Sequence, residues 1–115
     1  MTKIPIIRDD DGELLGYVAQ ELSGWSARTI FGYVLARTDS QSSAESVVRN
    51  EALLVLKGLW RYLDPDDRDW HPCILKDIQE SRVTVVRTNE LGYEDPEHYK
   101  LVILKNPSEN TLQAA

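Results

Sequence analysis

The chain has 115 residues, of which 42% are hydrophobic and 28% are charged, and its formal net charge is −6. These values are typical of a folded protein of one-domain length and exclude a disordered chain. The excess of acidic over basic side chains argues against a surface that binds nucleic acid or anionic lipid.

Cys73 is the only cysteine of the sequence, so an intramolecular disulfide is excluded. A single thiol is typical of a protein from a reducing compartment. The apolar run at residues 4–7 is too short for the core of a signal peptide, and no stretch approaches the roughly 18 apolar residues of a membrane span. We therefore expect a soluble, cytoplasmic protein with no membrane partner.

Strand-like segments begin the chain. Residues 3–8 are β-branched and apolar, and Pro5 near their start is typical of an edge strand. The run Asp9-Asp10-Asp11-Gly12 favours a tight turn, and residues 13–20 supply the return strand. Ser23-Gly24 predicts a second turn.

Residues 25–37 carry the longest strand signal, and both faces of that strand are largely apolar. The pattern therefore predicts a central strand covered on most of its length, and it leaves open which face meets the core. One face would carry Trp25, Ala27, Thr29, Phe31, Tyr33 and Leu35, and the other Ser26, Arg28, Ile30, Gly32, Val34 and Ala36.

A helix is predicted from Ser42 to Leu63. Ser42 and Glu45 have the spacing of a capping box, and Asp64-Pro65 supplies a stop signal. Apolar side chains recur between them at three- and four-residue intervals, as on one face of a helix. They are Ala44, Val48, Ala52, Val55, Leu56, Leu59 and Leu63.

Three more strands are expected after the helix, at residues 70–78, 82–88 and 98–104, the first two joined as a hairpin. The predicted fold is α+β: a twisted antiparallel sheet of five to six strands, in the order βββ-α-βββ, packed on one long helix. We expect a single domain over residues 1–105 and a flexible C-terminal tail over 106–115.

Groups that could support catalysis or bind metal are few. The run Asp9–Asp11 lacks the spacing of a calcium loop, and we interpret it as a turn. The cluster Asp64, Asp66, Asp67 and Asp69 would hold a divalent ion weakly at best, since Arg68 lies inside it, and we interpret it as a solvated connector. His71 and Cys73 share a strand face, and with His98 they would make a three-ligand zinc site or a thiol–histidine pair. No orienting group or phosphate loop accompanies them. We therefore expect no catalytic residue, metal or cofactor, and keep a small hydrolase or metal enzyme as an alternative.

Aromatic side chains supply the candidate binding residues, because rigid rings bury much area at low entropic cost. Some lie on the predicted strand 25–37 and others lie in or beside the second group of strands. With one arginine from the first group, the candidates are Trp25, Arg28, Phe31, Tyr33, Trp70, Tyr93 and Tyr99.

Two layouts resemble known families. Residues 13–63, strands followed by a helix with Ala-Leu-Leu-x-Leu-Lys-Gly, resemble the three-stranded DNA-binding modules of the plant AP2 and phage-integrase arm type. That resemblance implies DNA contacts from Trp25, Arg28 and Arg37. Residues 70–104, a Trp-led strand, a Val-rich strand and a Gly-Tyr-Glu loop, resemble part of a small SH3- or Tudor-like barrel, in which aromatic residues cage methylated side chains.

The function we expect is a non-catalytic protein-interaction module whose partner is another protein or a second copy of itself. An acidic chain with aromatic residues on its strands and no catalytic constellation favours this hypothesis. DNA binding through the first sheet is the alternative that the first resemblance implies.

Overall fold

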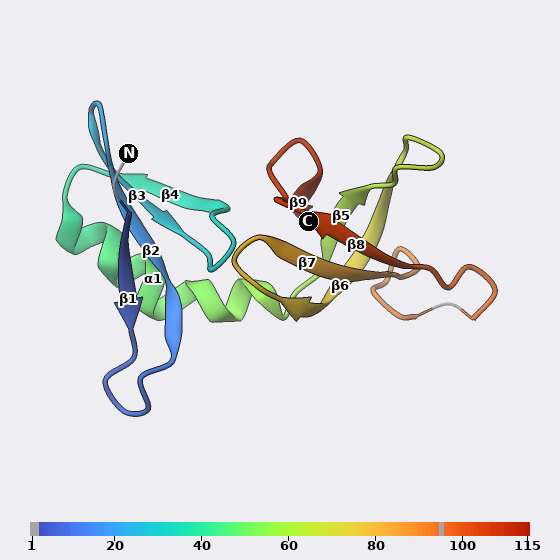
Figure 1. Ribbon diagram of the computed structural model, residues 1–115, viewed down its shortest axis with the longest axis horizontal. Coiled ribbons are helices and arrows are strands. Elements are labelled where there is room, and N and C mark those ends of the chain that lie inside the picture. The colour runs from blue at the N-terminus through green and yellow to red at the C-terminus, as the bar shows by residue number, and fades with distance from the viewer. Residues whose placement is uncertain (1–2, 95) are drawn as a thin grey trace. The chain divides into compact units, whose positions relative to one another are not determined.

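The computed structural model describes residues 3–94 and 96–115. This part of the chain contains one helix and nine strands (Figure 1). They divide into two compact units, the first ending at Val55 and the second running from Leu56 to Ala115. The α+β class is confirmed, but the single sheet of five to six strands is wrong, because the strands form two separate antiparallel sheets.

The first unit is a four-stranded sheet in which each strand pairs with its neighbour in the chain. The predicted hairpin turn between its first two strands is confirmed, and Gly12 takes the positive φ of 71° that this turn requires. The second predicted turn, at Ser23-Gly24, joins the next two strands. The strands are β1 (Lys3–Ile7), β2 (Leu14–Glu21), β3 (Gly24–Arg28) and β4 (Val34–Thr38).

The long strand predicted over residues 25–37 is wrong, because β3 ends at Arg28 and a turn precedes β4. Gly32 has a φ of 90°, and the turn is closed by a hydrogen bond of 2.9 Å from the amide of Thr29 to the carbonyl of Tyr33. The apolar and β-branched residues of the turn resemble a strand in sequence, but the glycine lets the chain reverse there. The open question of the face is resolved for β3: Ala27 and Trp25 pack in the core.

The helix α1 spans Gln41–Leu56 and covers this sheet. The helix begins one residue before the predicted start at Ser42. The predicted cap is wrong by two residues: the amide of Ser43 donates to Oγ of Ser40 at 3.1 Å, so Ser40 is the cap. The apolar stripe is confirmed where Ala44, Val48 and Ala52, four residues apart, are buried against the sheet. Their partners are Ile6, Leu15, Val18 and Ala27.

Gly16 on β2 lies close to both the backbone of β3 and the side chain of Val48 on α1. A Cβ atom at this position would lie 3.1 Å from Cγ1 of Val48 and 2.3 Å from the carbonyl oxygen of Arg28. A larger residue would clash first with the backbone of β3 and would also crowd Val48 of α1, so a glycine fits this position best.

The helix also ends earlier than the predicted C-terminal residue, Leu63. It ends at Leu56, and a strand begins at Trp60 after the break at Gly58. Trp60 and Tyr62 are fully buried in the second unit. The apolar spacing fits a strand as well as a helix over such a short stretch, and the β-favouring residues Trp60 and Tyr62 form the strand.

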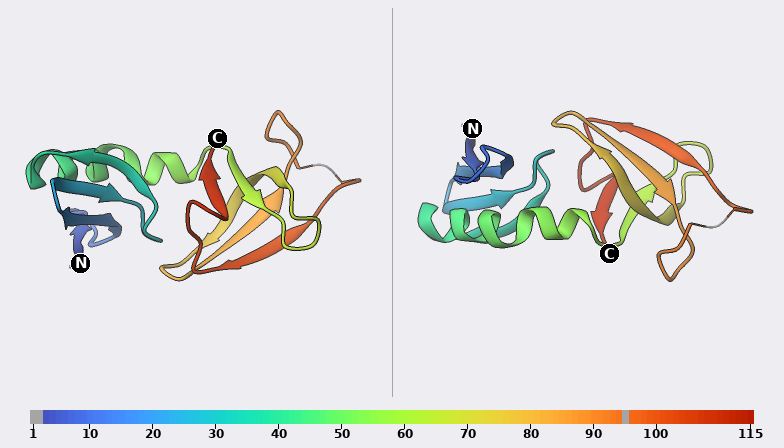
Figure 2. Two further views of the ribbon diagram at one scale, coloured as in Figure 1. Left: turned by 90° about the horizontal axis from the view of Figure 1, so that it is seen from above. Right: turned by 90° about the horizontal axis from the view of Figure 1, so that it is seen from below.

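The second unit is a five-stranded antiparallel sheet in the order β8-β7-β6-β5-β9 (Figure 2). Its strands are β5 (Trp60–Leu63), β6 (Trp70–Ile78), β7 (Arg82–Arg87), β8 (Leu101–Lys105) and β9 (Leu112–Ala114). The predicted β6–β7 hairpin is confirmed, and the predicted last strand begins three residues later than expected. The core of this unit is formed by Trp60, Tyr62, Cys73, Val83, Val85 and Leu112.

Residues 106–115 contain β9, which pairs with the free edge of β5, in place of the loose tail that we expected. Leu112 has no exposed surface. A three-residue strand is too short to leave an alternating pattern in the sequence, which is why this segment has the composition of a tail. Within the described residues, no helix has the length and apolar character to cross a membrane.

Candidate functional site

The predicted binding residues are divided between the two units. In the first unit, Trp25 is half-buried against the helix core, and the ring of Phe31 is buried with its centroid 6.4 Å from that of Tyr33. In the second unit, Tyr93 and Tyr99 are mostly exposed. The aromatic residues of the first unit therefore contribute mainly to packing, and the exposed tyrosines of the second unit are the ones available to a partner.

The arginines that would contact DNA already have carboxylate partners. Arg28 and Arg37 both bind Glu21, at 3.3 and 3.1 Å. Arg28 also donates to Oγ of Ser26 at 2.9 Å. The single carboxylate of Glu21 offsets one of these two positive charges, so the sheet face presents less positive charge than a DNA-reading face would need.

Cys73 and His71 do not form a catalytic pair. Cys73 is fully buried on β6, and burial raises the pKa of its thiol to about 12, which keeps the sulfur protonated. His71 contacts Asp67 instead, with 2.8 Å between Nε2 and Oδ2. A protonated, buried thiol is a poor nucleophile and a poor metal ligand.

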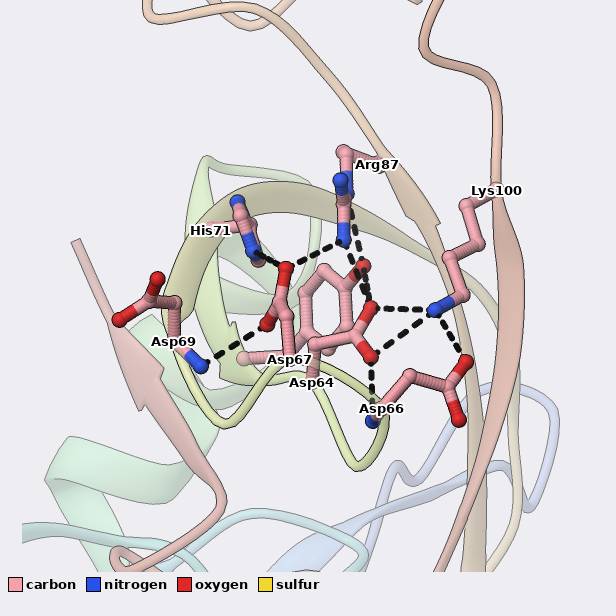
Figure 3. A network of polar contacts seen from close by, with 8 residues as sticks. Asp64, Asp66, Asp67, Asp69, His71, Arg87 and Lys100 are labelled. Atoms are coloured by element: carbon pink, nitrogen blue, oxygen red, sulfur yellow. Dashed lines mark hydrogen bonds and ion pairs between the residues drawn. The ribbon is translucent and has the colours of Figure 1, made fainter.

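The acidic segment 64–69 is exposed, as predicted for a solvated connector, except at Asp64, which is completely buried. Figure 3 shows the polar contacts around Asp64. This residue follows β5, and its Oδ2 accepts hydrogen bonds from the hydroxyl of Tyr62 at 3.0 Å and from Nη2 of Arg87 at 2.7 Å. Its Oδ1 accepts from Nζ of Lys100 at 2.9 Å and from the amide of Asp66 at 2.8 Å. Two cations thus compensate one buried carboxylate.

The charge state of this network follows from its hydrogen bonds. Burial alone raises the pKa of Asp64, but the bonds from Lys100, the Asp66 amide and Tyr62 outweigh burial and leave the pKa well below its ordinary value. Hydrogen bonds to Asp64 and Asp66 raise the pKa of Lys100. The carboxylate and the ammonium group therefore stay ionised at neutral pH.

The same network includes the one group of described His, Cys, Asp and Glu residues close enough to share a metal ion, namely Asp64, Asp67 and His71, whose ligand atoms lie within 4.8 Å of one another. Arg87 lies among them, with Nη2 2.7 Å from Asp64 and 3.8 Å from Asp67. Protein cations thus already supply the positive charge that an ion would bring. The geometry supports a structural role: the network ties the 64–69 loop and the start of β8 to the end of β7.

β8 lies at one edge of the second sheet, and its side chains alternate between the two faces. Val102 and Leu104 point into the core with 9% of their surface exposed, whereas Leu101 and Ile103 are 51% and 52% exposed. Tyr99, just before the strand, is 54% exposed. These three apolar side chains at alternate positions form an exposed row, which we call the β8 row.

The backbone of β8 is open along the same edge. The amide of Arg87 donates to the carbonyl of Lys100 at 2.9 Å, and the amide of Asn106 donates to the carbonyl of Ser81. Because hydrogen-bonded pairs alternate in an antiparallel ladder, the backbone groups of even-numbered β8 residues face β7. Those of Leu101, Ile103 and Lys105 face away from β7, where no described strand pairs with them.

A groove of about 460 Å³ lies beside this edge. Apolar side chains make up part of its lining, and two cationic side chains, Arg68 and Lys105, border it. The other lining residues are Leu63, Asp64, Pro65, Ile103, Leu104 and Thr111.

The sequence reasoning included one member of the β8 row, Tyr99, and missed Leu101 and Ile103. Their alternation with Val102 and Leu104 is visible in the sequence, but apolar residues on both faces indicate a covered strand. Only the strand order shows that β8 is an edge. Comparison with protein-family models, with curated proteins and with solved structures finds no match for this chain, so its function is argued from this geometry.

Proposed function

We propose that this protein is a non-catalytic module that binds another protein by pairing an extended segment of that partner with β8. The observation that carries the proposal is the open edge of β8, where backbone groups that no described strand pairs with lie beside the exposed side chains of Leu101 and Ile103. An added strand gains main-chain hydrogen bonds from such an edge, and its alternate side chains gain apolar contacts.

Other sheet edges of the molecule are less suited to pairing. At the β4 edge, the pairing with β3 shifts register between Ala27 and Arg28, and the apolar side chains of Val34 and Leu35 are half-buried. β1 contains Pro5, which has no amide hydrogen, and a register shift between Ile6 and Ile7 distorts its pairing with β2. β9 has only three residues. Proteins commonly protect edges by such devices, whereas β8 contains no proline and pairs with β7 without any register shift. Its Leu101 and Ile103 are 51% and 52% exposed, against 37% and 40% for Ile4 and Ile7 of β1.

The proposal is tested with peptides displayed on phage, selected from a random library on the full-length protein. The discriminating variant is Ile103→Pro, which removes an amide hydrogen from the open edge, and the matched control is Ile103→Thr, which keeps that amide on a β-branched residue. We expect peptides selected on the wild-type protein to lose binding to Ile103→Pro and to keep part of it with Ile103→Thr. Peptides that bind Ile103→Pro as well as the wild type would contradict pairing at β8.

A further inference from the structure

The chemistry of the segment that β8 receives can be specified further, on the basis of the proposed function. We infer that this segment is acidic: an extended stretch of alternating apolar residues that carries carboxylates at the end lying beside Lys105. The partner is then recognised by main-chain pairing, by the β8 row and by a group of cations at one end of the strand.

The first observation is a like-charged pair. Arg82 and Lys105 stand directly opposite each other on β7 and β8, and both are exposed. In the part of the chain that the structure describes, neither side chain has a carboxylate partner. Like charges directly opposite on a sheet are destabilising, so a carboxylate from outside would relieve this repulsion.

The second observation is the composition of the groove beside the edge. Arg68 borders it together with Lys105, and Arg68 also has no ion-pair partner among residues 3–94 and 96–115. The one carboxylate in its lining, Asp64, is already bound by Arg87 and Lys100. Arg68, Arg82 and Lys105, which have no carboxylate partner in the described part of the chain, therefore lie around the C-terminal end of β8, in a protein whose net charge is −6.

The two ends of β8 differ in charge, which gives the edge a polarity. At the N-terminal end, Lys100 is bound by Asp64 and Asp66, at 2.9 and 2.6 Å. At the C-terminal end, Lys105 has no carboxylate partner among the residues that the structure describes. A bound segment is therefore expected to place its carboxylates beside Lys105 and its apolar residues beside Leu101 and Ile103.

A second copy of β8 fits this edge less well. Residues 99–106, Tyr-Lys-Leu-Val-Ile-Leu-Lys-Asn, contain no carboxylate and two lysines. Pairing two copies would bring more cations to the edge instead of compensating those already present. Lysines on an edge strand are also a common device against edge-to-edge association.

The experiment compares the library selection on the wild-type protein with the same selection on Ile103→Pro and on the double charge reversal Arg82→Glu/Lys105→Glu. We expect wild-type peptides that alternate apolar residues with Asp or Glu. Their affinity for the charge-reversed protein should fall by about tenfold or more, because two attractive contacts become repulsive. Both substituted side chains are exposed, and circular dichroism checks that each variant is folded.

Each outcome decides between the two claims. Neutral or basic peptides that lose binding to Ile103→Pro but not to the charge reversal would overturn the acidic partner and leave edge pairing intact. Peptides insensitive to Ile103→Pro, or no enrichment at all, would overturn the proposed function itself. A dimer in light scattering that Ile103→Pro converts to a monomer would identify the occupant as a second copy and overturn the inference.

Discussion

The ammonium group of Lys100 lies 2.9 Å from Oδ1 of Asp64, and this contact joins two segments that are 36 residues apart in the sequence. Asp64 follows β5, and Lys100 immediately precedes β8. The contact therefore fixes the start of the edge strand on which the proposed function depends. A buried carboxylate that positions the strand is the structural basis of the site.

Removing the charge of Asp64 should destabilise the second unit strongly. Asp64→Asn leaves Arg87 and Lys100 without their shared carboxylate. Removing one partner of a buried ion pair lowers the free energy of unfolding by about 3 to 5 kcal/mol. Urea unfolding followed by tryptophan fluorescence measures the change. The control is Asp66→Asn, which loses only an exposed partner of Lys100 and should have a much smaller effect; equal effects would contradict the account.

The stabilisation by Asp64 should disappear in acid. Its folded-state pKa lies below the ordinary value of 3.8, so the unfolded chain takes up this proton first as pH falls. The contribution is therefore fully present well above pH 3.8 and is lost as pH falls through the folded-state pKa. The difference in unfolding free energy between wild type and Asp64→Asn should shrink between about pH 6 and about pH 2. A difference that stays constant over this range would contradict a carboxylate held ionised by Lys100 and Arg87.

The part of the fold that could be predicted is local. The β6–β7 hairpin was predicted because polar residues 79–81 separate two apolar runs, and the helix because Ala44, Val48 and Ala52 repeat at intervals of four. The pattern predicts too long a helix because Leu59 and Leu63 continue that spacing although they belong to the second unit. Over so few residues, periodicity does not separate a helix from a strand.

The candidate site depends on contacts between distant residues. Arg87 and Lys100 lie 23 and 36 residues from Asp64, and no spacing in the sequence relates them. The edge position of β8 is likewise a property of strand order, since β9 pairs with β5 and not with β8. Composition indicated that a binding surface was more plausible than a catalytic centre, but only the strand order locates the open edge.

The C-terminal segment 106–115 should contribute to stability, although its composition is that of a flexible tail. Leu112→Ala removes a completely buried side chain and should cost about 2 to 5 kcal/mol. Gln113→Ala, one residue further along the same strand and exposed, is the matched control and should have little effect. Denaturant unfolding measures both, and wild-type stability in Leu112→Ala would mean that β9 does not pack on β5.

The register of β8 predicts opposite effects of proline at adjacent positions. Val102→Pro removes an amide that faces β7 and leaves the carbonyl of Val85 unpaired, which should cost about 1 to 3 kcal/mol or more. Ile103→Pro removes an amide that faces outward, so its cost should be clearly smaller. Thermal unfolding of the two variants compares them directly. Equal destabilisation would contradict the alternation of backbone groups on which the proposal depends.

Cys73 should be unreactive in the folded protein. Its thiol is fully buried and its pKa is raised to about 12, so almost no thiolate is present at neutral pH. A colorimetric thiol reagent should therefore react slowly with the native protein and rapidly after denaturation. Fast reaction in the native state would reopen the hydrolase or metal-enzyme alternative.

The most direct test of the open β8 edge is amide hydrogen exchange in the full-length protein, followed residue by residue by NMR. The account predicts an alternating pattern, with slow exchange at Val102 and Leu104, whose amides face β7, and fast exchange at Leu101 and Ile103. Equally slow exchange at all four residues would show that another segment or another copy already covers the edge, and would contradict the central claim.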